Sequence, residues 1–106
     1  MSDTLTALAA LIEGRRGADA GSSYTASLLA KGREKCAEKF GEEAIEAIIA
    51  ATKGDQENLT AEAADVLFHL QVMLTASGVA WADVLATLEA RQGTSGHAEK
   101  AARSGS

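Results

Sequence analysis

The segment KFGEEAIEAIIAA, residues 39–51, places three glutamates within five residues of an otherwise apolar stretch. At about 100° per residue on an α-helix, Glu42, Glu43 and Glu46 fall within an arc of about 100°. Apolar side chains cover the rest of the circumference, and no Lys or Arg follows within the segment. Such a helix is expected to be largely buried, with one anionic strip as its polar face.

A second helical segment repeats this pattern shortly afterwards. Its polar residues fall within a strip of about 60°, and they are Asn58, Glu62, Asp65 and His69. The intervening turn, KGDQEN, is short, so the two helices are expected to lie antiparallel and to face each other. Four or five carboxylates then converge.

Carboxylates this close cannot all stay ionised unless a cation lies among them. Mg²⁺ prefers oxygen ligands and keeps positions open for water or phosphate, and Mn²⁺ can replace it. One histidine without cysteine is too few ligands for a typical zinc site. The pattern therefore predicts a magnesium site, and the alternative is an ordinary solvated acidic face.

Four basic residues precede the first acidic strip, and they are Lys31, Arg33, Lys35 and Lys39. Lys35 and Lys39 fall on the same face as the glutamates. Lysines leading into a carboxylate cluster suit a polyphosphate bridged by Mg²⁺. The alternative is a solvated helix of mixed charge, in which Glu34 and Glu38 pair with the lysines.

An all-α fold of four to five helices is expected, because the chain is rich in alanine and aliphatic residues and has no proline. Apolar spacing and glycine positions predict helices from Asp3 or Thr4 to Ile12 or Glu13, from Ser23 or Thr25 to about Lys53 with a break near Gly32, from about Leu59 to Ser77 before Gly78, and from Trp81 or Ala82 to Arg91. Residues 14–23 read as a loop, and Gly41 as a site of close packing. We expect one domain over residues 1–93, followed by a tail at 94–106.

Composition excludes several classes of function. A net charge of −5 argues against a nucleic-acid partner, because binding to phosphate backbones needs excess Lys and Arg. No apolar run approaches the roughly 18 residues of a membrane span, and the single Cys36 suits a packed residue in a reduced, cytoplasmic setting. A chain of 106 residues buries a small core, which favours a homodimer.

Two longer stretches carry a family resemblance. They are SYTASLLAKGREKCAEKFGEEAIEAIIAA at 23–51 and AEAADVLFHLQVML at 61–74, with GTSG at 93–96. Together they resemble the phosphoribosyl-ATP pyrophosphohydrolase family, a branch of the all-α, MazG-like nucleotide pyrophosphohydrolases. The superfamily signature is split between them: the first stretch carries E-E-x-x-E as Glu42, Glu43 and Glu46, and the second carries E-x-x-D as Glu62 and Asp65.

The resemblance implies Mg²⁺-dependent hydrolysis of the α–β phosphoanhydride of 1-(5-phosphoribosyl)-ATP to phosphoribosyl-AMP and pyrophosphate, the second step of histidine biosynthesis. It also implies a helical bundle completed across a homodimer. The metal ligands implied are Glu43, Glu46, Glu62 and Asp65, with Glu42 as a further ligand or the group that orients water. The substrate-binding residues implied are Tyr24, Thr25, Lys31, Lys35, Lys39 and His69. The alternatives are a house-cleaning pyrophosphohydrolase of non-standard nucleoside triphosphates and a non-catalytic helical interaction module.

Overall fold

The computed structural model describes residues 3–92, which form five α-helices and, over that range, no strand. In chain order the helices are α1 (Asp3–Gly14), α2 (Tyr24–Ala30), α3 (Arg33–Lys53), α4 (Gln56–Ala76) and α5 (Trp81–Gln92). The expected all-α class, the loop after α1 and the break near Gly32 are confirmed. The tail at 94–106 and the domain boundary before it lie outside the described residues.

Local capping explains where the helices begin and end. Helix α4 begins at Gln56 instead of near Leu59, because the Asp55 carboxylate accepts a hydrogen bond from the Asn58 backbone N–H at 3.1 Å. Gly54 ends α3 with a left-handed φ of 74°, and Gly78 follows α4 with a φ of 77°. Both glycines adopt a conformation that other residues rarely reach.

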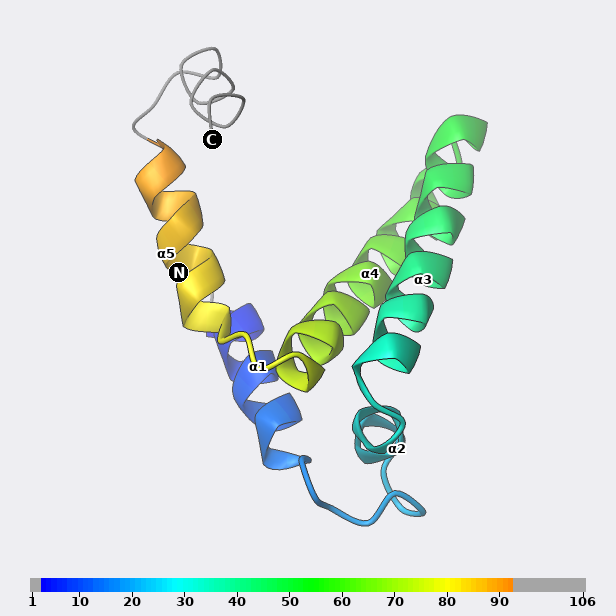
Figure 1. The fold of residues 1–106 in the computed structure, drawn as a ribbon. Coiled ribbons are helices and arrows are strands. Elements are labelled where there is room, and N and C mark those ends of the chain that lie inside the picture. Colours follow the sequence, from blue (N-terminus) through cyan, green and yellow to red (C-terminus); the bar gives the residue numbers. More distant parts are fainter. Residues whose placement is uncertain (1–2, 93–106) are drawn as a thin grey trace.

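The helices form a V, as Figure 1 shows. Helices α3 and α4 lie antiparallel and side by side as one arm, and theirs is the most extensive contact between helices. Helix α5 forms the other arm, α1 lies near the vertex, and α2 lies at the foot of α3. The site described below lies on the α3–α4 arm.

A small core joins α1, α2, α3 and α4 near the vertex. Its buried residues are Ile12, Leu28, Cys36 and Val72. The Cys36 thiol donates a hydrogen bond to the Leu28 carbonyl at 3.2 Å, so its expected role as a packed residue is confirmed. Burial also raises the pKa of this thiol, which keeps it protonated.

Two long-range hydrogen bonds fasten α1 and the loop that follows it to α4. The Gln71 amide donates to the Leu5 carbonyl at 2.9 Å, and the Arg16 guanidinium donates to the Thr75 carbonyl at 2.7 Å. Arg16 also pairs with Glu13, one turn earlier. The guanidinium therefore satisfies a carbonyl in the last turn of α4, where a cation is favourable.

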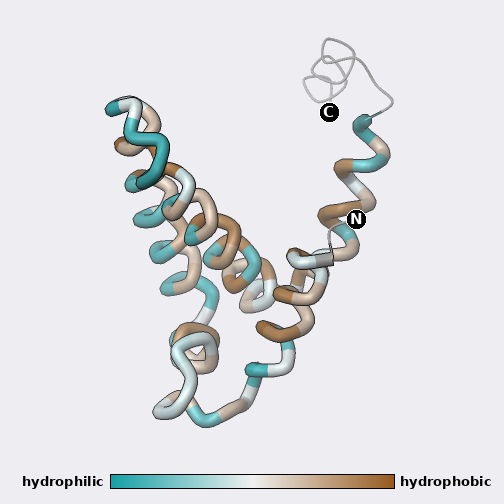
Figure 2. Tube along the Cα trace, turned by 180° about the vertical axis from the view of Figure 1, so that it is seen from behind, coloured by the Kyte–Doolittle hydropathy of each residue, from teal (hydrophilic) through white to brown (hydrophobic). Residues whose placement is uncertain are grey.

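The expectation that α3 is largely buried is wrong for the single chain. Within α3, Cys36 and Ala50 are buried, whereas Ile45 is 58% exposed and Ile48 is 60% exposed. Figure 2 shows hydrophobic residues along both arms of the V. The physical reason is that the long hairpin pairs α3 with α4 alone over most of its length, so the opposite side of α3 has no neighbour among the described residues.

Within residues 3–92, no single helix is both long enough and apolar enough to span a membrane. Helices α4 and α5 meet that requirement only as a pair and only by length and composition, and they are bent by 114° at the break between them.

Two glycines provide a matched test of backbone conformation. Gly32, between α2 and α3, has φ 94° and ψ 169°, a region occupied almost solely by glycine, whereas Gly41 lies inside α3. At both positions, none of the described residues comes within 4 Å of an added Cβ. The expected close packing at Gly41 is therefore wrong for the single chain.

We expect Gly32→Ala to lower the free energy of unfolding by about 1–3 kcal/mol, because alanine is strained at this φ and ψ. Gly41→Ala should raise it by about 0.5–1 kcal/mol, because alanine restricts the unfolded chain and favours the helix. Urea unfolding followed by circular dichroism measures both changes. Destabilisation by Gly41→Ala would instead show that something packs closely against this position.

Candidate active site

The packing of α3 against α4 brings three carboxylates together. Glu43 comes from α3, and Glu62 and Asp65 come from α4, where a spacing of three residues places them on one face. One carboxylate oxygen from each residue lies within 4.8 Å of the other two. The expected meeting of the two acidic strips is present in the structure, with these three residues at its centre.

Glu62 is the carboxylate of this cluster on which burial and neighbouring negative charge act together. Burial raises the pKa of its carboxyl above the ordinary value, and the neighbouring carboxylates of Glu46, Glu43 and Asp65 raise it further. Its Oε1 atom is buried and has no hydrogen-bond partner among the described residues. A buried carboxylate oxygen without a donor is costly, and a cation would satisfy it.

The donor set fits a hard divalent cation. Three carboxylates offer only oxygen, the ligand that Mg²⁺ and Mn²⁺ prefer, and three such ligands leave coordination positions for water or phosphate. Glu46 lies outside this group of three but close enough to Glu62 to affect its pKa. Its carboxylate therefore lies beside the cluster of three.

Glu42 contacts a lysine instead of the three carboxylates. The Lys39 ammonium lies 3.2 Å from Glu42 Oε1, and this hydrogen bond is the largest cause of a raised pKa at Lys39. Glu42, Glu43 and the Tyr24 phenol also raise that pKa electrostatically, so Lys39 lies near all three groups. Lys39 therefore stands at the edge of the carboxylate cluster, as its face on the helix predicts.

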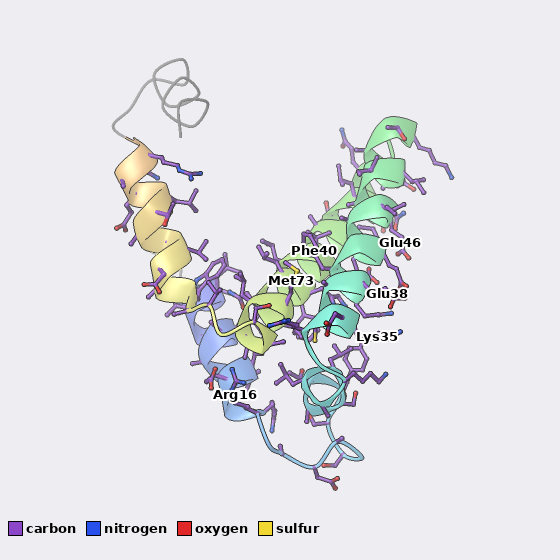
Figure 3. The ribbon with its side chains drawn as sticks, in the orientation of Figure 1. Arg16, Lys35, Glu38, Phe40, Glu46 and Met73 are labelled. Carbon is purple, nitrogen blue, oxygen red and sulfur yellow. The ribbon has the colours of Figure 1, made fainter. Side chains whose placement is uncertain are left out.

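The other expected lysines lie differently. Lys35 pairs with Glu38 at 3.0 Å, one turn along α3. The alternative of a solvated helix of mixed charge predicts such a pair, and the two residues are three apart in the sequence. In Figure 3, Lys35, Glu38 and Glu46 project from the side of α3 that faces away from α5, whereas Phe40 lies on the inner side of the V. Lys31 is exposed at the end of α2. Roles for Lys31 and Lys35 in binding phosphate stay predictions.

An aromatic group lies beside the carboxylates. The Tyr24 ring stacks on Phe68 with centroids 6.4 Å apart, and His69 meets Phe68 edge-on at 5.0 Å and Tyr24 edge-on at 6.4 Å. His69 is buried, yet its Nδ1 has no hydrogen-bond partner among the described residues. Thr25 is half-buried in the first turn of α2.

Phe68 is the residue that the sequence analysis missed. The periodicity of the helix placed Phe68 only among its apolar residues, although Phe68 lies three residues after Asp65 and next to His69. A spacing of three residues places a side chain one turn along the same face. That spacing was the available signal, but apolar residues at such positions are usually core.

We expect Glu62→Gln to flatten the pH dependence of stability of the metal-free protein. The fold raises the pKa of Glu62, so the protonated carboxyl contributes favourably to the free energy of unfolding. This contribution is complete below the pKa of the unfolded state, roughly 4.3, and is lost as pH rises through the pKa of the folded state. Urea unfolding in EDTA at several pH values should show a smaller loss of stability toward neutral pH in the variant. Glu89→Gln, on the exposed surface of α5, is the control. Identical pH profiles for Glu62→Gln and wild type would contradict the electrostatic cost assigned to Glu62.

Known proteins are similar to this chain over nearly its whole length. Residues 5–92 match the family model described as phosphoribosyl-ATP pyrophosphohydrolase. A phosphoribosyl-ATP pyrophosphatase of Ruegeria pomeroyi is 70% identical over 91% of this chain and 91% of its own length. Those of Cereibacter sphaeroides and Rhodobacter capsulatus are each 67% identical, over 93% of this chain and 96% of their own lengths. A match of this extent, on a chain with these helices and this carboxylate cluster, shows that the protein belongs to the phosphoribosyl-ATP pyrophosphohydrolase family.

Proposed function

We propose that this chain hydrolyses the α–β phosphoanhydride of 1-(5-phosphoribosyl)-ATP, releasing phosphoribosyl-AMP and pyrophosphate in the second step of histidine biosynthesis. The family membership and the names of close relatives support this substrate. The observation that carries the proposal is the cluster of Glu43, Glu62 and Asp65, whose buried, unpartnered oxygen suits a cation. Such a cluster beside a lysine suits a polyphosphate.

In this proposal Glu43, Glu62 and Asp65 hold Mg²⁺, or Mn²⁺ in its place, and Glu46 joins them from the next turn of α3. Such an ion would supply polarisation of the phosphoryl oxygens, an acidified water and neutralisation of charge on the departing pyrophosphate. The three carboxylates lie on two packed helices, whose backbones are stiffer than loops. Glu62 would stay ionised beside such an ion, because the positive charge would outweigh the neighbouring negative charges.

Lys39 and Glu42 have two further roles in the proposed reaction, binding phosphate and orienting water. Lys39 binds phosphate oxygens as a point charge at the edge of the cluster. Its present partner, Glu42, is then released to accept a hydrogen bond from the attacking water and to orient it. Lys31 and Lys35, on the approach to the site, add positive charge for the outer phosphates. Tyr24, Thr25 and His69 lie toward the nucleoside end.

The reaction is tested by the product that the purified protein releases from phosphoribosyl-ATP. We expect Mg²⁺-dependent release of pyrophosphate, because cleavage at the inner anhydride leaves the outer two phosphates joined. Pyrophosphate-specific and orthophosphate-specific assays run in parallel, with EDTA as the control, measure this. Orthophosphate as the primary product would overturn the proposal.

The same assay separates the alternatives. A panel of standard and non-standard nucleoside triphosphates, offered at equal concentration, should give lower kcat/KM values than phosphoribosyl-ATP. Preference for a non-standard triphosphate would indicate a house-cleaning enzyme instead. Absence of any hydrolysis, together with no binding of Mg²⁺ by calorimetry, would indicate an interaction module.

We propose also that the protein is a homodimer, with the exposed isoleucines of α3 in the interface. These are Ile45, Ile48 and Ile49, and their spacing places them on one face, opposite to α4. A contiguous row of exposed aliphatic side chains is unfavourable in water and is typical of an interface. A second copy packed here would lie beside Glu42 and Glu46 on the same helix.

Light scattering should report twice the mass of one chain for wild type. Ile48→Glu should shift the equilibrium toward monomer, because it places a charge in an apolar interface. Ala20→Glu, in the loop between α1 and α2, is the control and should leave the mass unchanged. A wild-type monomer that stays helical and active at nanomolar concentration would contradict the proposal.

A further inference from the structure

Tyr24 is an exposed aromatic residue that is nevertheless held in place. Its side chain is 59% exposed, although Phe68 stacks against it and His69 meets its edge. The backbone around it is helical, because Tyr24 begins α2 and the Ser23 hydroxyl oxygen caps that helix by accepting a hydrogen bond from the Ala26 N–H. An aromatic side chain with a fixed orientation and an open surface is suited to binding a flat ligand.

The position of Tyr24 relative to the carboxylates suggests which ligand. On α4, Phe68 and His69 follow Asp65 by three and four residues, so the aromatic group begins about one helical turn, ~5–6 Å, from the carboxylate cluster. Lys39 lies near both groups, because its ammonium is 3.2 Å from Glu42 Oε1 and both Glu43 and the Tyr24 phenol are close enough to raise its pKa. The carboxylates, the lysine and the aromatic ring therefore come from three neighbouring helices, α3, α4 and α2.

We infer that the exposed ring of Tyr24 is the platform on which the adenine base of the substrate stacks. This inference rests on the proposed function, because it takes the carboxylate cluster as the site of the α–β anhydride. In a nucleoside triphosphate, one sugar separates the α-phosphate from the base. That separation is similar to the distance of about one helical turn between the carboxylate cluster and the aromatic group. Lys39 then meets the α-phosphate side of the same ligand.

Stacking explains the aromatic group better than a role in the protein core does. A core aromatic residue is buried, whereas Tyr24 leaves more than half of its surface open. Phe68 and His69 are less exposed than Tyr24. Phe68 stacks on one face of the Tyr24 ring, and His69 packs against it edge-on. The remaining explanation is that a second copy of the chain covers Tyr24, and the experiment must separate this from binding of a base.

Two commercially available ligands separate binding of the base from binding of the phosphates. The first is α,β-methylene-ATP, which carries adenine and cannot be cleaved at the α–β position. The second is inorganic tripolyphosphate, which has no base. Isothermal titration calorimetry in Mg²⁺ gives the Kd of both ligands for wild type, Tyr24→Leu and Tyr24→Phe, with light scattering to confirm that all three have the same mass.

We expect wild type to bind α,β-methylene-ATP more tightly than tripolyphosphate. Tyr24→Leu should weaken binding of the nucleotide roughly 5- to 100-fold, the range for loss of one base–aromatic stack, and should change the Kd of tripolyphosphate less than about 2-fold. Tyr24→Phe keeps the ring face, so it should retain the wild-type Kd for both ligands.

Three results would overturn the inference. They are equal weakening of both ligands by Tyr24→Leu, no weakening of the nucleotide, or a wild-type preference for tripolyphosphate. A changed mass in Tyr24→Leu, with unchanged nucleotide binding per chain, would assign Tyr24 to an interface instead. Pyrophosphate release from phosphoribosyl-ATP tests the proposed function separately, because calorimetry with the uncleavable nucleotide reports binding without the reaction.

Discussion

The antiparallel packing of α3 on α4 is the contact on which the rest of the structure depends. It brings Glu43 against Glu62 and Asp65, which lie about twenty residues away along the chain. It also places Lys39 within reach of the same cluster, because Lys39 lies one turn before Glu43 on α3. The site is therefore built on two long helices, whose backbones are stiffer than loops and can hold ligand atoms in a constant arrangement.

This arrangement opposes stability in the absence of a cation. Glu62 is surrounded by other carboxylates and has a buried oxygen without a partner among the described residues, so ionising it is unfavourable. A divalent ion reverses the sign of that interaction, since each carboxylate then faces a positive charge. The local cost in the metal-free chain and the proposed affinity for a cation would have the same physical origin, and binding of the ion to the native state alone would stabilise the fold.

The single chain covers its apolar surface incompletely. Its core lies near the vertex of the V, around Ile12, Leu28, Cys36 and Val72, while the isoleucines of α3 remain exposed. A chain of 106 residues has too much surface for its volume to bury every apolar face of two 21-residue helices. The proposed second copy would cover the face of α3 that α4 leaves open, and would do so next to the carboxylates.

Local sequence determined the helices, their ends and the two acidic strips, because periodicity, glycine positions and capping residues act within a few residues along the chain. The break at Gly32, the cap after α4 and the last helix were all predictable on these grounds. Only the tertiary structure decided which carboxylates meet, that Glu42 contacts Lys39 instead, and that Phe68 joins Tyr24 and His69. Those contacts depend on how each helix is rotated about its axis against its neighbour, and that rotation is set by side chains packing across segments far apart in the sequence.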